Sequence, residues 1–143
     1  MIAIRGKEVE AQDAGARSGL PPMAFTRKWL VHREVGDDSY GHRFALREFT
    51  LAPGVFASMH KHQYVEAVYV ISGKLFFENF DERIEVGPGD VLYTYEWEPH
   101  SLGVIGDSPA KIVCCIDCLN GGDNCSPTSG KGGPQTVETN PKG

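Results

Sequence analysis

A cluster of side chains with the types and spacing of a metal site lies in residues 54–73, where His60 and His62 are followed by Glu66. Two histidines at positions i and i+2 point to the same side of a β-strand, because strand side chains alternate between the two faces. A carboxylate four residues further on can reach the same ion from a neighbouring strand, and His100 is a fourth candidate. Neutral imidazole and carboxylate form a ligand set for a divalent transition metal with one or two open positions.

A histidine pair alone is more simply explained as part of a solvated strand edge. A metal site becomes the better interpretation once Glu66, His100 and the two bracketing glycines, Gly54 and Gly73, are included. Both glycines have a structural role in either case, because glycine permits turns with positive φ.

The composition describes an ordinary globular chain. It has 143 residues, of which 41% are hydrophobic and 23% charged, so one domain with a real core is expected. The net charge of −5 argues against a nucleic-acid partner, since phosphate binding needs a basic surface. No apolar run is long enough to cross a bilayer, and the N-terminus does not have the pattern of a signal peptide. We therefore expect a cytoplasmic protein without a membrane partner.

Four cysteines lie together near the C-terminus: Cys114, Cys115, Cys118 and Cys125. In a reducing cytosol they are expected to be thiols. Cys115, Cys118 and Cys125 could offer three thiolates to zinc, but a fourth ligand is not evident nearby. The favoured interpretation is that Cys114 or Cys115 packs on a strand as a small apolar residue, with the others in a loop.

The rest of the chain predicts short strands that could position these ligands. Each candidate segment is rich in Val, Ile, Phe and Tyr and is bounded by glycine, proline or acidic turns. The expected strands are residues 23–31, 43–51, 55–62, 66–72, 74–80, 83–86, 90–95, 100–105 and 111–117. No interval here shows a helical apolar stripe, so the pattern predicts an antiparallel sandwich or barrel.

Several local features refine this expectation. Residues 36–39 are turn material, and hairpin turns are expected at residues 72–73 and 87–90. Within residues 43–51 the apolar phase slips between Leu46 and Phe49, which a bulge could accommodate. Three regions follow: an N-terminal arm at 1–23, a β-barrel domain at 24–118, and a Gly/Pro-rich tail at 119–143 that is expected to be irregular.

The residue pattern resembles the cupin superfamily. The first signature is matched throughout by Gly54, His60, His62, Glu66 and Gly73 with their spacings. The second is partly kept by Gly87, Gly89, Asp90, Pro99 and His100, whereas Tyr95 and Trp97 stand where the family usually has Pro and Gly, and Val104 replaces a frequent Asn. The resemblance covers roughly residues 40–117.

The resemblance implies an all-β fold, an antiparallel double-stranded β-helix (jelly-roll) barrel that is often dimeric. It also implies a metal in the barrel mouth, held by His60, His62, Glu66 and His100. The residue pattern agrees, because Glu66 shares a strand face with Val68 and Val70, which would line the interior.

A cupin fold does not fix a function, and three hypotheses remain open. The favoured one is a dioxygenase that uses a divalent transition metal, chosen among Fe, Mn, Ni, Zn and Cu with Fe or Mn favoured. The second is a non-redox metal-dependent isomerase, lyase or cyclase, and the third is a ligand-binding module without turnover. Each has a small-molecule ligand, and a homodimer is expected from the family.

One cupin family of cyclases can be examined residue by residue. The run from Glu66 to Tyr69 is similar to ectoine synthase, but Leu92 stands where that family has a metal-side tyrosine. Tyr93 should face the opposite side, and His62 takes the place of a lysine. These departures argue against ectoine synthase activity. Some cupin lyases use a tyrosine near the metal, and that resemblance would make Tyr64 the equivalent residue here.

Residues around the motifs suggest what the pocket could accept. The aromatic residues Phe44, Phe56, Tyr64, Tyr95 and Trp97 could line a pocket, or belong to the core or a dimer interface. Glu96 and Glu98 are expected in a solvated turn, although they could favour a cationic substrate. Near the ligands in sequence Lys61 is the one basic residue, and strand parity turns it away, which argues against a phosphorylated substrate.

Overall fold

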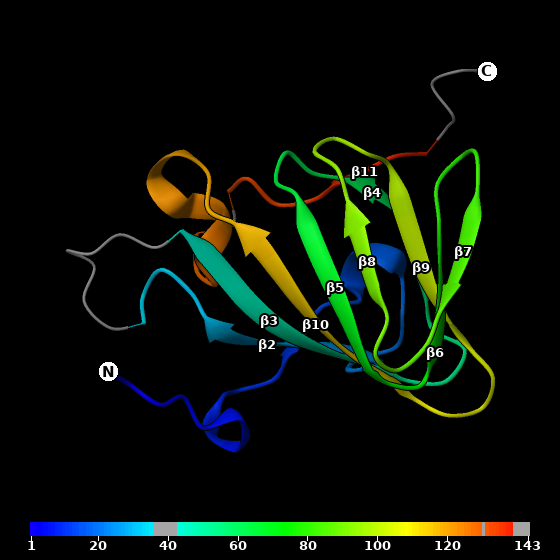
Figure 1. Cartoon of the computed structure of the whole chain (residues 1–143), viewed down its shortest axis with the longest axis horizontal. Helices are drawn as coiled ribbons and strands as arrows, with labels where there is room; N and C mark the ends of the chain where they lie inside the picture. The colour runs from blue at the N-terminus through cyan, green and yellow to red at the C-terminus, as the bar shows by residue number, and fades with distance from the viewer. Residues whose placement is uncertain (36–42, 130, 139–143) are drawn as a thin grey trace.

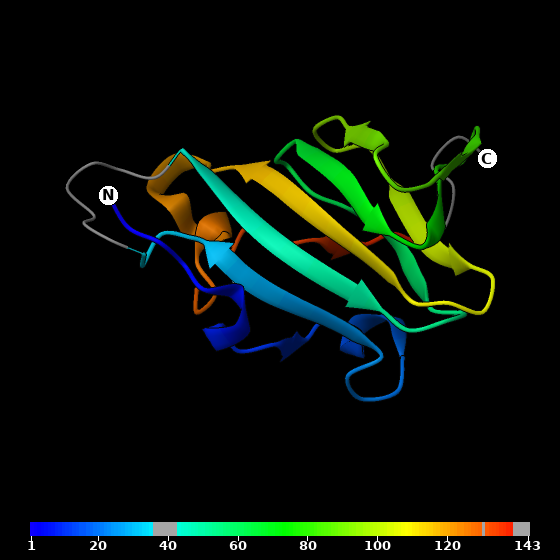
Figure 2. The same ribbon diagram turned by 60° about the horizontal axis from the view of Figure 1, so that its bottom comes forward.

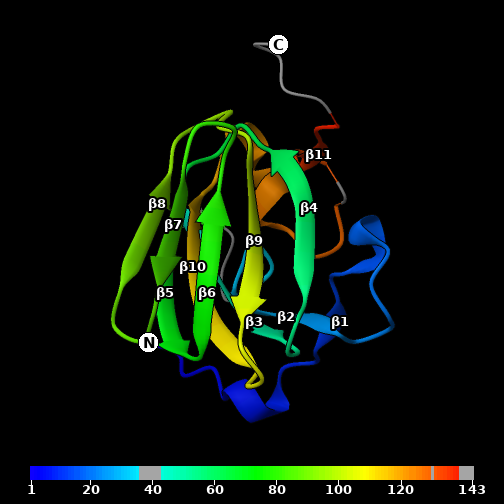
Figure 3. The ribbon, with the colours of Figure 1, turned by 90° about the vertical axis from the view of Figure 1, so that its right-hand side faces the viewer.

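Two antiparallel β-sheets face one another in the computed structural model, which describes residues 1–35, 43–129 and 131–138. The six-stranded sheet has the order β1-β2-β3-β10-β5-β8, and the five-stranded sheet has the order β11-β4-β9-β6-β7. Figure 3 shows the five-stranded sheet toward the viewer, with β7, β6, β9 and β4 side by side. This arrangement is the jelly-roll architecture predicted from the sequence.

The strands observed agree with the predicted ones to within two residues at each end. They are β1 Gln12–Asp13, β2 Phe25–Val31, β3 Phe44–Leu51, β4 Phe56–Lys61, β5 Glu66–Ser72, β6 Lys74–Glu78, β7 Arg83–Val86, β8 Val91–Thr94, β9 His100–Ile105, β10 Ala110–Asp117 and β11 Gln135–Thr136. The two-residue strands β1 and β11 were not expected. The short 3-10 helices η1 (Gly6–Glu8), η2 (Ala16–Ser18) and η4 (Asn120–Cys125) were also missed.

The space between the sheets holds the hydrophobic core. Its fully buried members come from both sheets, and they include Leu51, Val68, Val70 and Leu75. Glu66 lies at the start of β5 on the same face as Val68 and Val70, as strand parity predicted. The core therefore fills one part of the interior, and the polar end of β5 faces another.

The predicted bulge within residues 43–51 is wrong. Along β3 every second residue is buried, and Arg47 occupies one of these inner positions. The apparent slip in the apolar pattern arises because an arginine stands at a core-facing site, so the strand itself stays regular. The register shift lies instead in the neighbouring strand β2, between Trp29 and Val31.

The two predicted hairpins are also wrong, because both turns join strands of different sheets. Gly73 connects β5 of the six-stranded sheet to β6 of the five-stranded sheet, and residues 87–90 connect β7 back to β8. A hairpin and a sheet-crossing corner use the same glycine-rich sequences, so only the strand pairing distinguishes them. The turn expected at residues 36–39 lies outside the described residues.

Both ends of the chain add to the sheet edges. The N-terminal segment pairs through β1 with β2, and Figure 2 shows it alongside that strand. The tail pairs through β11 with β4, and places Thr136 opposite His60. The predicted division into an N-terminal arm, a β-barrel domain at residues 24–118 and a tail stays a prediction. Among the described residues, no helix has the length and apolar character needed to span a membrane.

The expectation that all four cysteines are thiols is wrong for two of them. Cys118 and Cys125 form a disulfide with their Cα atoms 5.5 Å apart. The Asn124 side chain brings them together, because it donates to the carbonyl of Asp117 at 2.7 Å and accepts from the amide of Leu119 at 2.9 Å. The disulfide also removes two of the three thiolates considered for zinc.

The other two cysteines are free. Cys114 is buried on β10 and Cys115 is half-buried on the same strand. Cys114 therefore packs as a small apolar residue, as the sequence predicted.

The corner at Gly73 offers a test of the fold. Gly73 has φ +80°, and a Cβ added there would lie 2.6 Å from the carbonyl oxygen of Pro109. We expect Gly73→Ala to lower the free energy of unfolding by about 3 kcal/mol, from left-handed strain and from steric conflict together. The matched control is Gly54→Ala, because Gly54 has φ +75° with open space around it. That variant should lose about 1 kcal/mol, from strain alone. Equal losses in urea denaturation would contradict the steric argument.

Candidate metal centre

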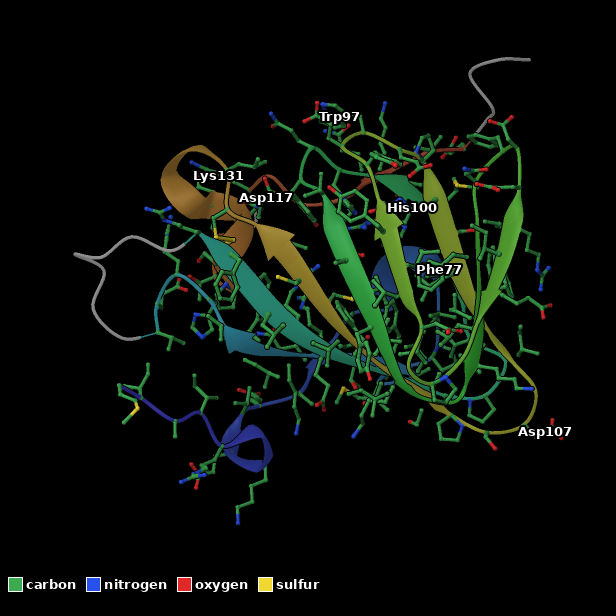
Figure 4. The ribbon with its side chains drawn as sticks, in the orientation of Figure 1. Phe77, Trp97, His100, Asp107, Asp117 and Lys131 are labelled. Atoms are coloured by element: carbon green, nitrogen blue, oxygen red, sulfur yellow. A yellow bond between two sulfur atoms is a disulfide. The ribbon has the colours of Figure 1, made fainter. Side chains whose placement is uncertain are left out.

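Three of the four predicted ligands come together between the sheets. His60 lies on β4 and pairs with His100 at the start of β9, and His62 follows directly after β4. One ligand nitrogen from each ring lies within 4.8 Å of the other two. Figure 4 shows His100 above Phe77. Trp97 lies on the loop of residues 95–99 that joins β8 to β9, here called the rim loop. The described residues therefore contain one cluster of histidines able to hold a metal ion.

A bulge in β4 turns His60 toward this cluster. Ala57 pairs with Leu102 and His60 pairs with His100, so β4 has one more residue than β9 over this interval. The extra residue shifts the strand parity, and both Ala57 and His60 line the interior cavity. His62 lines the same cavity, which agrees with the shared face predicted for the two histidines.

The hydrogen bonds of the three rings leave one nitrogen of each available for a metal. In each ring Nδ1 lies against a backbone carbonyl, which can only accept: Ser58 at 2.8 Å for His60, Tyr64 at 2.8 Å for His62, and Glu98 at 2.7 Å for His100. Each Nδ1 therefore carries the proton, and each Nε2 keeps a free lone pair. The Nε2 of His100 is buried and has no hydrogen-bond partner among the residues that the structure describes. Such a donor set fits a divalent metal.

Burial keeps His60 and His62 neutral, as metal ligation requires. Desolvation, together with the neighbouring His100, lowers the pKa of His60 to about 4. The pKa of His62 is also lowered, chiefly by burial, although Glu66 opposes the shift. At neutral pH both rings therefore present lone pairs rather than positive charge.

The fourth predicted ligand, Glu66, is held by an arginine. Its Oε2 accepts a hydrogen bond from Arg47 at 2.7 Å, and the carboxylate lies outside the group formed by the three rings. Burial acts to raise the pKa of Glu66, but Arg47 and the three histidines outweigh it and hold the pKa below its usual value. Glu66 is thus an ionised carboxylate beside the cluster, and its role as a ligand stays a prediction.

Sequence reasoning missed Arg47. Its side chain is buried with only 5% exposure, and its guanidinium lies over the rings of Trp29 and Phe49 at 5.3 and 5.1 Å. Burial alone would lower its pKa, but Tyr64 and Glu66 raise it above the ordinary value. The available signal was the interrupted apolar alternation of residues 43–51, which marks an arginine at an inner position.

A cavity of about 720 Å³, part of it open to solvent, adjoins the cluster. Apart from His60, His62 and Glu66, its walls combine basic and apolar groups: Arg17, Arg27, Arg47, Phe25, Phe49, Tyr64, Phe77, Leu102, Ile112 and Cys114 are among them. Tyr64 is therefore a pocket residue, as considered from the sequence. Tyr95 lines a separate depression beside His100, whereas Phe44, Phe56 and Trp97 are 50%, 44% and 45% exposed.

The rim loop positions His62 through the backbone. Trp97 donates its amide proton to the carbonyl of His62 at 2.7 Å and has φ +60°. Glycine adopts this left-handed conformation without strain, which agrees with the glycine that the resemblance to cupins implies at this position. Glu98 holds the same loop by accepting hydrogen bonds from the amide of Tyr95 and the side chain of Asn79. Glu98 thus has the structural role expected of a turn residue.

The strand parity argued for β8 is also observed. Leu92 packs against the core, and Tyr93 is 50% exposed on the other face. The tyrosine typical of ectoine synthase therefore has no counterpart at this position of β8.

The fold and the histidine cluster are those of a small jelly-roll protein whose interior could hold a metal ion. The family model described as "Cupin domain" matches residues 47–116. The chain belongs to the cupin superfamily.

Curated relatives include two named L-ectoine synthase. The one from Bordetella petrii is 30% identical over 101 residues, which are 69% of this chain and 74% of that protein. The one from Bordetella avium is 29% identical over 102 residues, covering 69% and 75%. An uncharacterized protein of Methanocaldococcus jannaschii is 33% identical over 76 residues, covering 52% of this chain and 61% of that protein, so the match spans less than two thirds of its length.

Solved structures show the same fold at low sequence identity. The polyketide cyclase RemF from Streptomyces resistomycificus has a TM-score of 0.70 and 20% identity, and the match covers 99% of this chain and 88% of that chain. A predicted oxalate decarboxylase from Thermotoga maritima has a TM-score of 0.69 and 21% identity, with coverage of 82% and 100%.

The ion pair between Arg47 and Glu66 can be tested by a mutant cycle. Arg47→Met leaves the Glu66 carboxylate buried without its partner, so we expect the free energy of unfolding to fall by about 3 kcal/mol. Adding Glu66→Gln should restore part of that loss. The control is Lys111→Met, which removes a surface pair with Glu48 at 3.8 Å and should cost less than about 1 kcal/mol.

The same pair predicts an acid limb of stability. The folded pKa of Glu66 lies below its ordinary value of 4.5, so the ionised carboxylate stabilises the fold above that pH. This contribution should disappear as the pH falls through the lowered pKa. Below pH 4.5 the free energy of unfolding of the wild type should therefore fall more steeply with pH than that of Glu66→Gln. Parallel curves in denaturation experiments would contradict the assignment.

Metal content tests the cluster directly. We expect His60→Ala, His62→Ala and His100→Ala each to weaken metal binding by at least about 100-fold, since each removes one of the converging nitrogens. His32→Ala is the control, because His32 bonds to Glu34 away from the cluster. Metal analysis of the purified proteins provides the measurement. A His60→Ala protein with stoichiometric metal would overturn the assignment, and metal loss in Glu66→Gln would make Glu66 a ligand.

Proposed function

We propose that this cupin is a metal-dependent enzyme acting on a small organic molecule in the cavity beside His60 and His62. The observation that carries the proposal is the convergence of three imidazoles whose Nδ1 atoms all lie against backbone carbonyls. A divalent metal bound there would act as a Lewis acid and leave positions open for substrate. His60, His62 and His100 are the proposed ligands, with Glu66 as a fourth or as their charge partner.

Tyr64 is the side chain best placed to take part in proton transfer. It lines the cavity, and its ring stacks on His62 with the centroids 4.0 Å apart. Burial raises its pKa to about 12, with Glu66 adding to the shift and Arg47 opposing it. The phenol therefore stays protonated at neutral pH and can donate a hydrogen bond to a substrate oxygen on which negative charge develops.

This protonated phenol favours non-redox chemistry: isomerisation, elimination or cyclisation. The names of relatives support the same class, since they include ectoine synthases and a polyketide cyclase. A dioxygenase is the second candidate. Three nitrogen ligands, with Glu66 held by Arg47, leave several coordination positions open, which suits iron or manganese chemistry with O₂.

Turnover with and without oxygen separates the two reaction classes. Metal-loaded protein is incubated with a library of small organic acids in air and anaerobically, and products are followed by mass spectrometry. We expect conversion to proceed without O₂. Conversion that consumes O₂ would overturn the non-redox assignment and favour the dioxygenase, and a protein that binds ligands without converting any would be a binding module.

The role of Tyr64 has its own variant. Tyr64→Phe keeps the ring that stacks on His62, so metal content should stay unchanged while kcat falls by about 100-fold or more. The control is Tyr93→Phe, on the outer face of β8. Equal activity of the two variants would exclude Tyr64 from the chemistry.

A further inference from the structure

The cavity beside the histidine cluster is unusually basic for a protein with a net charge of −5. Three arginines, Arg17, Arg27 and Arg47, line it, and Glu66 is the one carboxylate among the lining residues. Glu66 is already paired with Arg47. The walls therefore keep positive charge that no cavity side chain neutralises.

Arg27 is the centre of this excess charge. It lies on β2 and pairs with Phe49 of β3. Two residues further along β2, Trp29 pairs with Arg47. The NH2 group of Arg27 donates to the neutral amide oxygen of Gln12 at 3.3 Å, and among the described residues it makes no ion pair within 4.0 Å.

Donors of both arginines remain unused. The Nε of Arg27 and the Nε of Arg47 are buried and have no hydrogen-bond partner among the described residues. A buried guanidinium donor without an acceptor is costly, and an anion in the adjoining cavity would offset that cost. Burial and the like charge of Arg47 lower the pKa of Arg27 to about 10, which leaves it positively charged at neutral pH.

The remaining walls are apolar. Phe25 and Phe49 lie with their ring centroids 5.3 Å apart, and Phe77 and Ile112 line the same cavity. An anion that enters would therefore place its charge near the arginines and its body against hydrocarbon. Guanidinium groups match carboxylates well because two parallel N–H donors meet two oxygens.

We propose that the cavity binds a small monocarboxylate with an apolar body, its carboxylate held by Arg27 and its other end directed toward His60 and His62. This inference rests on the proposed function, and names the substrate class of the same site. In the sequence Lys61 is the one basic residue near the ligands, whereas the fold brings Arg27 and Arg47 to the same cavity from β2 and β3.

Benzoate is a suitable probe, because it joins a carboxylate to a flat apolar ring. Isothermal titration of the metal-free protein should show binding of benzoate and at least about 10-fold weaker binding of its neutral isostere benzamide. Arg27→Gln should weaken benzoate at least about 10-fold and leave benzamide unchanged. Arg83→Gln is the control, because Arg83 stacks on Phe76 outside the cavity and should not alter either ligand.

A second variant separates the effect of the positive charge at position 27 from the effect of the paired donors. Arg27→Lys keeps the charge but loses the paired donors, so it should bind benzoate more weakly than the wild type and more tightly than Arg27→Gln. Phenyl phosphate tests the other common anion of similar shape. Benzoate affinity that does not change in both Arg27 variants, or tighter binding of phenyl phosphate than of benzoate, would overturn the proposal.

Failure of the carboxylate site can be distinguished from failure of the proposed metal-dependent function. Benzoate that binds only to metal-loaded protein, with no dependence on Arg27, overturns the carboxylate site and leaves the metal site standing. Benzoate binding that depends on Arg27, in a protein that takes up no metal, supports the carboxylate site and contradicts metal-dependent catalysis.

Discussion

The buried ion pair of Arg47 and Glu66 sets the character of the whole interior. Its atoms lie 2.7 Å apart on β3 and β5, the two strands that flank β10, and both side chains are almost inaccessible to solvent. Neither charge could stay buried alone, because the cost of desolvating an unpaired ion exceeds what packing can offset. One end of the sandwich is therefore polar, and the apolar core is confined to the rest.

The histidine cluster depends on the backbone around this polar region. A bulge in β4 redirects His60, and each ring is oriented by a carbonyl of a nearby residue. The rim loop adds a third constraint, since Trp97 bonds to the carbonyl of His62. Rings fixed by main-chain atoms would lose little freedom on binding a metal, so the three histidines are preorganised for the proposed site.

The protein is acidic overall, whereas its cavity is basic. Arg27 on β2, Arg47 on β3 and Arg17 on η2 all line the cavity. An apolar cavity strengthens this local charge, because little water remains to screen it. The proposed site would thus combine a metal centre with recognition of an anion.

Side-chain alternation and ligand spacing are local properties, so the sequence alone predicted β2 to β10, an antiparallel sandwich or barrel, and the three histidines. The jelly-roll class was implied by the resemblance to cupins. Features that depend on pairing between distant strands emerged only in the folded chain. The turns at Gly73 and at residues 87–90 could be recognised locally, but only sheet pairing shows that they cross between sheets. Likewise the partner of Glu66 is an arginine nineteen residues away, on a strand separated from it by β10. Burial of Arg47 and the basic cavity follow from that packing, which no local pattern specifies.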